Sequence, residues 1–189
     1  SQLKRSPELR DIISNVSSLV KSSKNHEKYI EQILFNILMS IIQTNRRFMK
    51  NIKHIFNILS IILYVMNLIP SGDLAKSKSM IINGQYDIDI DTIESIIFWI
   101  LLKILYRFEI LKLFECNSKD FYSEIQQFIS NEMPFLHKCL STNYHYEDLS
   151  CLENSINCLF ADFFDLDDCV DMWSVALTFE CSNYYFISI

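Results

Sequence analysis

Glycine and proline are scarce in this sequence, with 2 and 3 copies among 189 residues. Sandwiches and barrels of β-strands use such residues in their many turns, so their scarcity favours helices joined by polar turns. A phosphate-binding loop of the GxxxxGK[ST] type also needs two closely spaced glycines, which Gly72 and Gly84 do not provide. The sequence therefore predicts an all-α fold without a nucleotide-binding loop.

Basic residues are also in the minority, since 17 Lys and Arg face 23 Asp and Glu, for a formal net charge of -6. Nucleic-acid-binding domains normally carry a basic face, so we expect no nucleic-acid partner. Hydrophobic residues make up 50% of the chain, which is enough for a globular core. We expect a single domain over residues 1–189, truncated at one or both ends because the sequence up to Ile189 still reads as apolar helix.

Motifs for catalysis and for metal binding are missing. The 6 cysteines contain no CxxC pair, and we expect reduced, mostly buried thiols in a cytoplasmic protein. The 4 histidines form no HExxH motif. Asp87, Asp89 and Asp91 alternate as in a calcium loop, but Thr92 stands where such a loop needs glycine. We therefore expect no metal and no cofactor.

Apolar residues recur at helical spacing along most of the chain. This periodicity predicts helices at about 7–21, 27–44, 48–68, 91–108, 117–130, 133–140 and 147–164. The apolar run 55–69 is shorter than the ~20 residues of a membrane span, so we expect a core helix and no transmembrane segment. The polar segment 70–90 reads as a surface loop, after which Asp91 and Glu94 are placed to cap the next helix.

The stretch Cys158–Phe179 predicts two helices joined by an acidic turn. The first helix is expected to bury one aromatic face, made of Leu159, Phe160, Phe163 and Phe164. Asp165 and Asp167 are placed to cap the second helix, and Asp168 lies in its first turn. The second helix is expected to bury a stripe made of Val170, Trp173, Val175, Leu177 and Phe179.

Three segments carry a resemblance to a known family. They are Ile93–Leu105 with its Phe98-Trp99 pair, Met133–Leu140 with its Met-Pro-Phe-Leu start, and Leu159–Trp173. Their order and spacing resemble the helices of the TBC domain, the fold of Rab GTPase-activating proteins. The resemblance runs from about Ile12 to the end of the chain and is most complete after Asp91. It implies an all-α, multi-helix TBC-like bundle that binds a Rab-type small GTPase.

The family also implies two catalytic residues, an arginine from an IxxDxxR motif and a glutamine from a YxQ motif. An arginine supplied in this way accelerates GTP hydrolysis by about 10³ to 10⁵. In this sequence Asn15 stands at the acidic position of the first motif and Ser18 at the arginine position. Lys50 and Ile52 stand at the tyrosine and glutamine positions of the second. We therefore predict no catalytic residue, and we expect a protein that is not an enzyme.

A basic cluster lies where the family's GTPase-facing loop would be, and it consists of Arg46, Arg47, Lys50 and Lys53. Such charges often do no more than solvate a helix start. The alternative is that the basic cluster contacts an acidic partner surface, with Asn15 and Ser18 as further partner-binding positions.

The resulting hypothesis is a pseudo-GAP that binds a Rab-type GTPase or another trafficking protein without catalysis. We expect a cytoplasmic protein that reaches endomembranes peripherally, through its partners. Two alternatives stay open. One is an active GTPase activator with displaced catalytic residues, and the other is a helical adaptor unrelated to GTPases.

Overall fold

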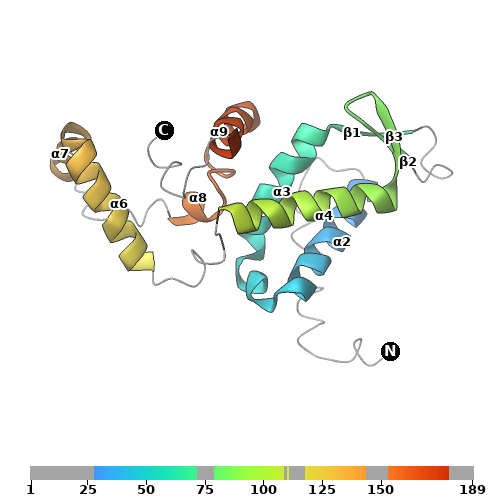
Figure 1. The fold of residues 1–189 in the computed structure, drawn as a ribbon, viewed down its shortest axis with the longest axis horizontal. Helices are drawn as coiled ribbons and strands as arrows, with labels where there is room; N and C mark the ends of the chain where they lie inside the picture. Colours follow the sequence, from blue (N-terminus) through green and yellow to red (C-terminus); the bar gives the residue numbers. More distant parts are fainter. Residues whose placement is uncertain (1–27, 72–78, 109, 111–117, 144–152, 179–189) are drawn as a thin grey trace. The chain divides into compact units, whose positions relative to one another are not determined.

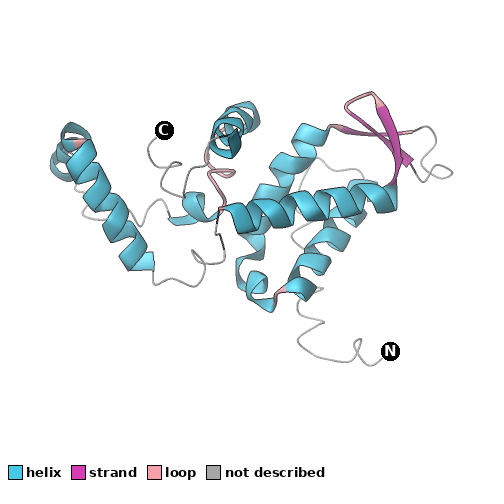
Figure 2. Ribbon diagram, viewed as in Figure 1, coloured by secondary structure: helices cyan, strands magenta, loops and turns pink. Residues whose placement is uncertain are grey.

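A computed structural model describes residues 28–71, 79–108, 110, 118–143 and 153–178. The helix expected over 7–21 lies outside these residues. The protein is mostly helical, as predicted, but it also contains a small antiparallel sheet that was not predicted (Figures 1 and 2). In chain order the elements are α2 (Lys28–Thr44), η2 (Arg46–Asn51, a 3-10 helix), α3 (Ile52–Met66), β1 (Leu68–Pro70), β2 (Ser79–Ile82), β3 (Tyr86–Asp89), α4 (Ile90–Arg107), α6 (Ser118–Glu132), α7 (Pro134–Asn143), α8 (Glu153–Asn157) and α9 (Leu166–Thr178).

The chain divides into two compact units, Ser1–Ile104 and Leu105–Ile189. The first unit contains α2, η2, α3, the sheet and most of α4, and the second contains α6 to α9. Two compact units can belong to one domain, so the single domain expected from the chain length stays a prediction.

Helices α2 and α3 supply most of the core of the first unit. Helix α2 buries one apolar face, since Ile33, Leu34 and Ile41, which recur at helical spacing, are all at most 1% exposed. Helix α3 buries eight of its 15 residues, as expected for a helix that is apolar nearly all round. By length and composition the stretch Arg46–Met66 could also cross a membrane. The burial of α3 within the first unit fits the expected core helix.

The C-terminus of α3 is set by Asn67, which adopts a left-handed conformation with φ 42. Its backbone N–H donates to the carbonyl oxygens of Leu63 and Tyr64, at 3.1 Å each. Asparagine tolerates this conformation better than most residues, and it is a common helix stop. The helix therefore ends at Met66, two residues before the predicted boundary at Leu68, where β1 begins.

The segment 70–90 was expected to be a surface loop, and that expectation was wrong for residues 79–82 and 86–89, which form β2 and β3. Asn83 and Gly84 both have positive φ, at 50 and 70, and Gln85 N–H bonds to the Ile82 carbonyl at 3.0 Å. This is the geometry of a type I′ turn, which Asn-Gly favours between two strands. The hairpin is held to the core because Met80 is fully buried.

The start of α4 also differs from the prediction. Asp89, rather than Asp91, caps this helix, because its carboxylate accepts hydrogen bonds from the backbone N–H of Thr92 at 2.8 Å and from the Thr92 hydroxyl at 2.6 Å. The hydrogen bond from the Thr92 hydroxyl, followed by that from its N–H, lowers the pKa of Asp89. The last residue of the hairpin, Asp89, is thus also the N-cap residue of α4.

In the second unit, α6 and α8 share a small core of Ile125, Ile129 and Ile156, with Phe160 packed against it. The helix predicted over 147–164 was wrong beyond Asn157, where turns follow α8. Leu159 and Phe160 have positive φ values of 54 and 61, so they cannot continue a helix.

The aromatic face predicted for this helix is therefore not formed. Phe163 and Phe164 are 66% and 40% exposed, whereas Leu159 is buried. Helix α9 begins directly after Asp165 and has Asp167 and Asp168 in its first turn. Of its predicted stripe, Trp173 is buried, while Val175 and Leu177 are exposed and Phe179 lies outside the described residues.

The left-handed Asn67 gives a test of the helix stop. Replacing Asn67 by Ala should lower the free energy of unfolding by about 1 kcal/mol, because a Cβ without a local hydrogen-bonding group disfavours positive φ. Replacing it by Gly should leave stability unchanged or slightly raised. Urea unfolding of both variants measures this, and equal effects of Ala and Gly would contradict the assigned conformation.

The cap of α4 gives a test by pH. The lowered pKa of Asp89 means that its contribution to stability is present at neutral pH and is lost as the pH falls through the interval below its ordinary value of 3.8. Asp89→Ala should therefore lower Tm at pH ~7 and lose most of this effect near pH ~2. Asp87→Ala is the control. It removes an exposed carboxylate that accepts a hydrogen bond from the Ser71 hydroxyl, and it should change Tm less.

Candidate functional site

The basic cluster of Arg46, Arg47, Lys50 and Lys53 lies on η2 and the first turn of α3, and all four side chains are exposed. The 3-10 helix that carries most of it is fixed at two points. Phe48 is fully buried, and Asn45 caps the helix by accepting a hydrogen bond from Arg47 N–H at 3.0 Å. The sequence thus places basic side chains around one apolar anchor, and the anchor holds them on the surface.

The other two predicted partner-binding residues, Asn15 and Ser18, lie outside the described residues, so their place beside the basic cluster stays a prediction. Lys50 and Ile52, which replace the tyrosine and glutamine of the YxQ motif, are respectively exposed and half-buried. The described residues of η2 and of the first turn of α3 include the four basic side chains of the cluster and no acidic one.

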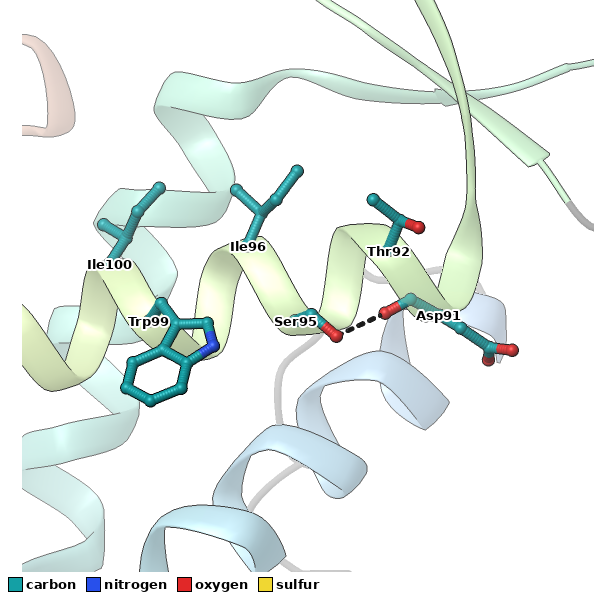
Figure 3. A pocket seen from close by; sticks show the side chains of 6 residues that line it. All are labelled: Asp91, Thr92, Ser95, Ile96, Trp99 and Ile100. Atoms are coloured by element: carbon teal, nitrogen blue, oxygen red, sulfur yellow. Dashed lines mark hydrogen bonds between the residues drawn. The ribbon is translucent and has the colours of Figure 1, made fainter.

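A second surface feature lies along the N-terminal half of α4, and we call it the α4 groove. Figure 3 shows two rows of side chains at a spacing of four, with Asp91, Ser95 and Trp99 in one row and Thr92, Ile96 and Ile100 in the other. The six residues line an open hollow of about 510 Å³. A neighbouring hollow of about 390 Å³ extends from Asp91, Ser95 and Trp99 to Asn36, Ile37, Ser40, Glu94 and Phe98.

Trp99 stands between the two hollows, since it lines both of them. It is 64% exposed, the most of the large apolar side chains described on α4, whereas Ile93, Ile97 and Leu101 of the same helix are fully buried. Phe98 supports it from one side, with ring centroids 5.4 Å apart and planes at 78°. Apolar patterning predicts an inward tryptophan in such a helix, so sequence reasoning did not identify this residue as a surface feature.

The floor of the second hollow is a hydrogen-bonded link between α2 and α4. Gln32 Nε2 donates to Asn36 Oδ1 at 2.8 Å, and Asn36 Nδ2 donates to Glu94 Oε1 at 2.8 Å. Burial raises the pKa of Glu94, and the negative charge of Asp91 raises it further, while the Asn36 hydrogen bond opposes both. Glu94 was predicted to cap its own helix, and the structure instead assigns it to this contact between helices.

The described thiols behave as predicted. Cys158 and Cys169 are buried and take part in no disulfide, and burial raises the pKa of Cys169 to about 11, which keeps it protonated. Cys139 is free and half-buried. Within the described ranges, no group of three or more His, Cys, Asp or Glu side chains is placed to hold a metal ion.

Comparison of the chain with protein-family models, with curated proteins and with solved structures found no match. The basic cluster and the α4 groove are the two surface features of the described residues that can indicate a function.

Glu94 provides a test of the link between α2 and α4. Because its pKa is raised in the folded protein, stability is lost as the pH rises through the interval above its ordinary value of 4.5. Glu94→Gln keeps an acceptor for Asn36 and removes the charge, so this loss should shrink. Urea unfolding between about pH 4 and pH 7 measures it. Glu132→Gln, at an exposed position in α6, should retain the wild-type pH dependence over this interval.

Proposed function

We propose that this protein is a TBC-like helical module that binds a Rab-type small GTPase or another trafficking protein without accelerating GTP hydrolysis. The observation that carries the proposal is the basic cluster, in which four exposed cations surround a buried anchor in an acidic protein. Such a surface attracts an acidic partner at long range and accelerates association. The resemblance to the TBC family supplies the partner class.

The absence of catalysis is proposed from the residues at the family's two motifs. Ser18 cannot replace an arginine that stabilises charge on a phosphate, because a hydroxyl is short and uncharged. Ile52 cannot orient an attacking water as a glutamine does. The proposed role is therefore binding alone, in the cytoplasm or peripherally at endomembranes through the bound GTPase.

Binding and hydrolysis should be measured together. A panel of Rab proteins, loaded with GTP or GDP, is titrated with the full chain, and single-turnover hydrolysis is followed in the same samples. We expect binding that prefers one nucleotide state and no acceleration. Acceleration lost in Arg46→Ala or Arg47→Ala would instead identify an active GTPase activator. No nucleotide-dependent binding to any member would leave a helical adaptor unrelated to GTPases.

The contribution of the basic cluster is tested by a charge-matched pair of variants. Lys50→Gln with Lys53→Gln should weaken binding roughly tenfold and reduce its salt dependence, since each exposed pair contributes up to about 1 kcal/mol. Lys103→Gln with Lys138→Gln removes the same charge from exposed positions on α4 and α7. Equal losses in both double variants would show that net charge, rather than this surface, determines affinity.

A further inference from the structure

The α4 groove differs from the basic cluster in charge and in chemistry. The described residues that line the α4 groove and the neighbouring hollow include the carboxylates of Asp91 and Glu94 and no Lys, Arg or His. The remaining described lining combines hydroxyl and amide groups with apolar side chains, which are those of Ile37, Ile96, Phe98, Trp99 and Ile100. A ligand that fills this groove therefore meets negative charge near the start of α4 and apolar surface one to two turns later.

Trp99 is suited to binding rather than to folding. The only other tryptophan of the chain, Trp173, is 5% exposed, and its indole N–H donates to the Leu159 carbonyl at 2.9 Å. Trp99 is 64% exposed, and most of its ring adds no buried area to the core. It is nonetheless well positioned, because it projects from a helix and rests against Phe98. Exposed, well-held tryptophans are favoured anchors at binding surfaces.

We propose that the α4 groove binds a short basic segment of a partner protein, with one Arg or Lys side chain against Trp99 and another at Asp91, about two helical turns away. Tryptophan is the best aromatic acceptor for a cation, and a carboxylate accepts hydrogen bonds from a guanidinium. Asp91, Ser95 and Trp99 lie in one row, so different side chains of the segment can contact Trp99 and Asp91 (Figure 3). Ile96 and Ile100 provide the neighbouring apolar contact for the next residue of the segment.

Charge complementarity selects this occupant. The first unit presents a basic surface on η2 and an acidic, aromatic groove on α4, and one partner surface of uniform charge cannot complement both. The α4 groove therefore adds a second binding function to the one proposed for the basic cluster, and the protein would join two partners of opposite charge. A second copy of this chain, which carries the basic cluster, is the competing occupant.

The test uses the full chain and a fluorescein-labelled peptide in which Arg alternates with Leu, with the same peptide carrying Glu for Arg as its control. Fluorescence anisotropy should show saturable binding of the Arg peptide alone. Trp99→Ala should weaken binding at least tenfold, as expected for a central aromatic anchor. Asp91→Asn should weaken it a few-fold, because an exposed ion pair contributes little.

Matched variants separate the groove from general effects of charge and exposure. Tyr86→Ala removes another exposed aromatic ring, on β3, and Asp168→Asn removes an exposed carboxylate from the first turn of α9. Both should bind the Arg peptide as the wild type does, and circular dichroism should show that all four variants keep their helix content. Equal losses in these controls would overturn the proposal.

Three further results would also overturn it. The first is binding of the Glu peptide as tight as that of the Arg peptide. The second is no saturable binding of Arg–Leu, Arg–Phe and Lys–Leu peptides. The third is a dimer in sedimentation experiments that dissociates in Trp99→Ala, since the groove would then be occupied by a second copy. The tryptophan emission offers an independent readout. It should shift on peptide binding in the wild type and stay fixed in Trp99→Phe, where Trp173 alone reports.

Discussion

The burial of α3 is the constraint on which the first unit depends. This helix places eight side chains in the core, and the elements at both of its ends are tied to it. At its start, η2 is anchored by Phe48, which turns the basic side chains outward. At its end, Asn67 stops the helix, and the Met66 carbonyl accepts a hydrogen bond from Asn83 N–H in the turn of the hairpin. The positions of the sheet and of the cap of α4 follow from this arrangement.

The sequence predicts the helices that have a regular apolar periodicity. The bounds of α2, α4, α6 and α7 fall within a few residues of those expected, because each has a regular apolar stripe. The hairpin was missed although Asn83-Gly84 is a strong turn signal. The low glycine content of the whole chain argued against strands, but a single glycine is enough for one hairpin. Composition describes the average of a chain and does not exclude a short local exception.

The segment after α8 shows a different limit. Leu159 and Phe160 fit a helical stripe by spacing, yet both adopt left-handed conformations that local preference disfavours. The indole of Trp173, 14 residues later, donates to the Leu159 carbonyl, and Phe160 packs on the core of α6 and α8. Contacts between residues distant in sequence thus outweigh the local pattern, and a reading of spacing alone cannot detect them.

Of the two candidate surfaces, one could be predicted from the sequence and the other could not. The basic cluster could be predicted from the sequence, because charged side chains are expected on the surface whatever the tertiary packing. All four side chains of the cluster are exposed in the structure. The α4 groove could not be found, because an apolar residue such as Trp99 is expected inside until the packing of its helix is known. Asp91 and Glu94 were interpreted as capping residues, and only the contact of Glu94 with Asn36 shows that they border a surface between helices. Charged sites are therefore the easier part of this protein to predict, and an aromatic site on a core helix requires the structure.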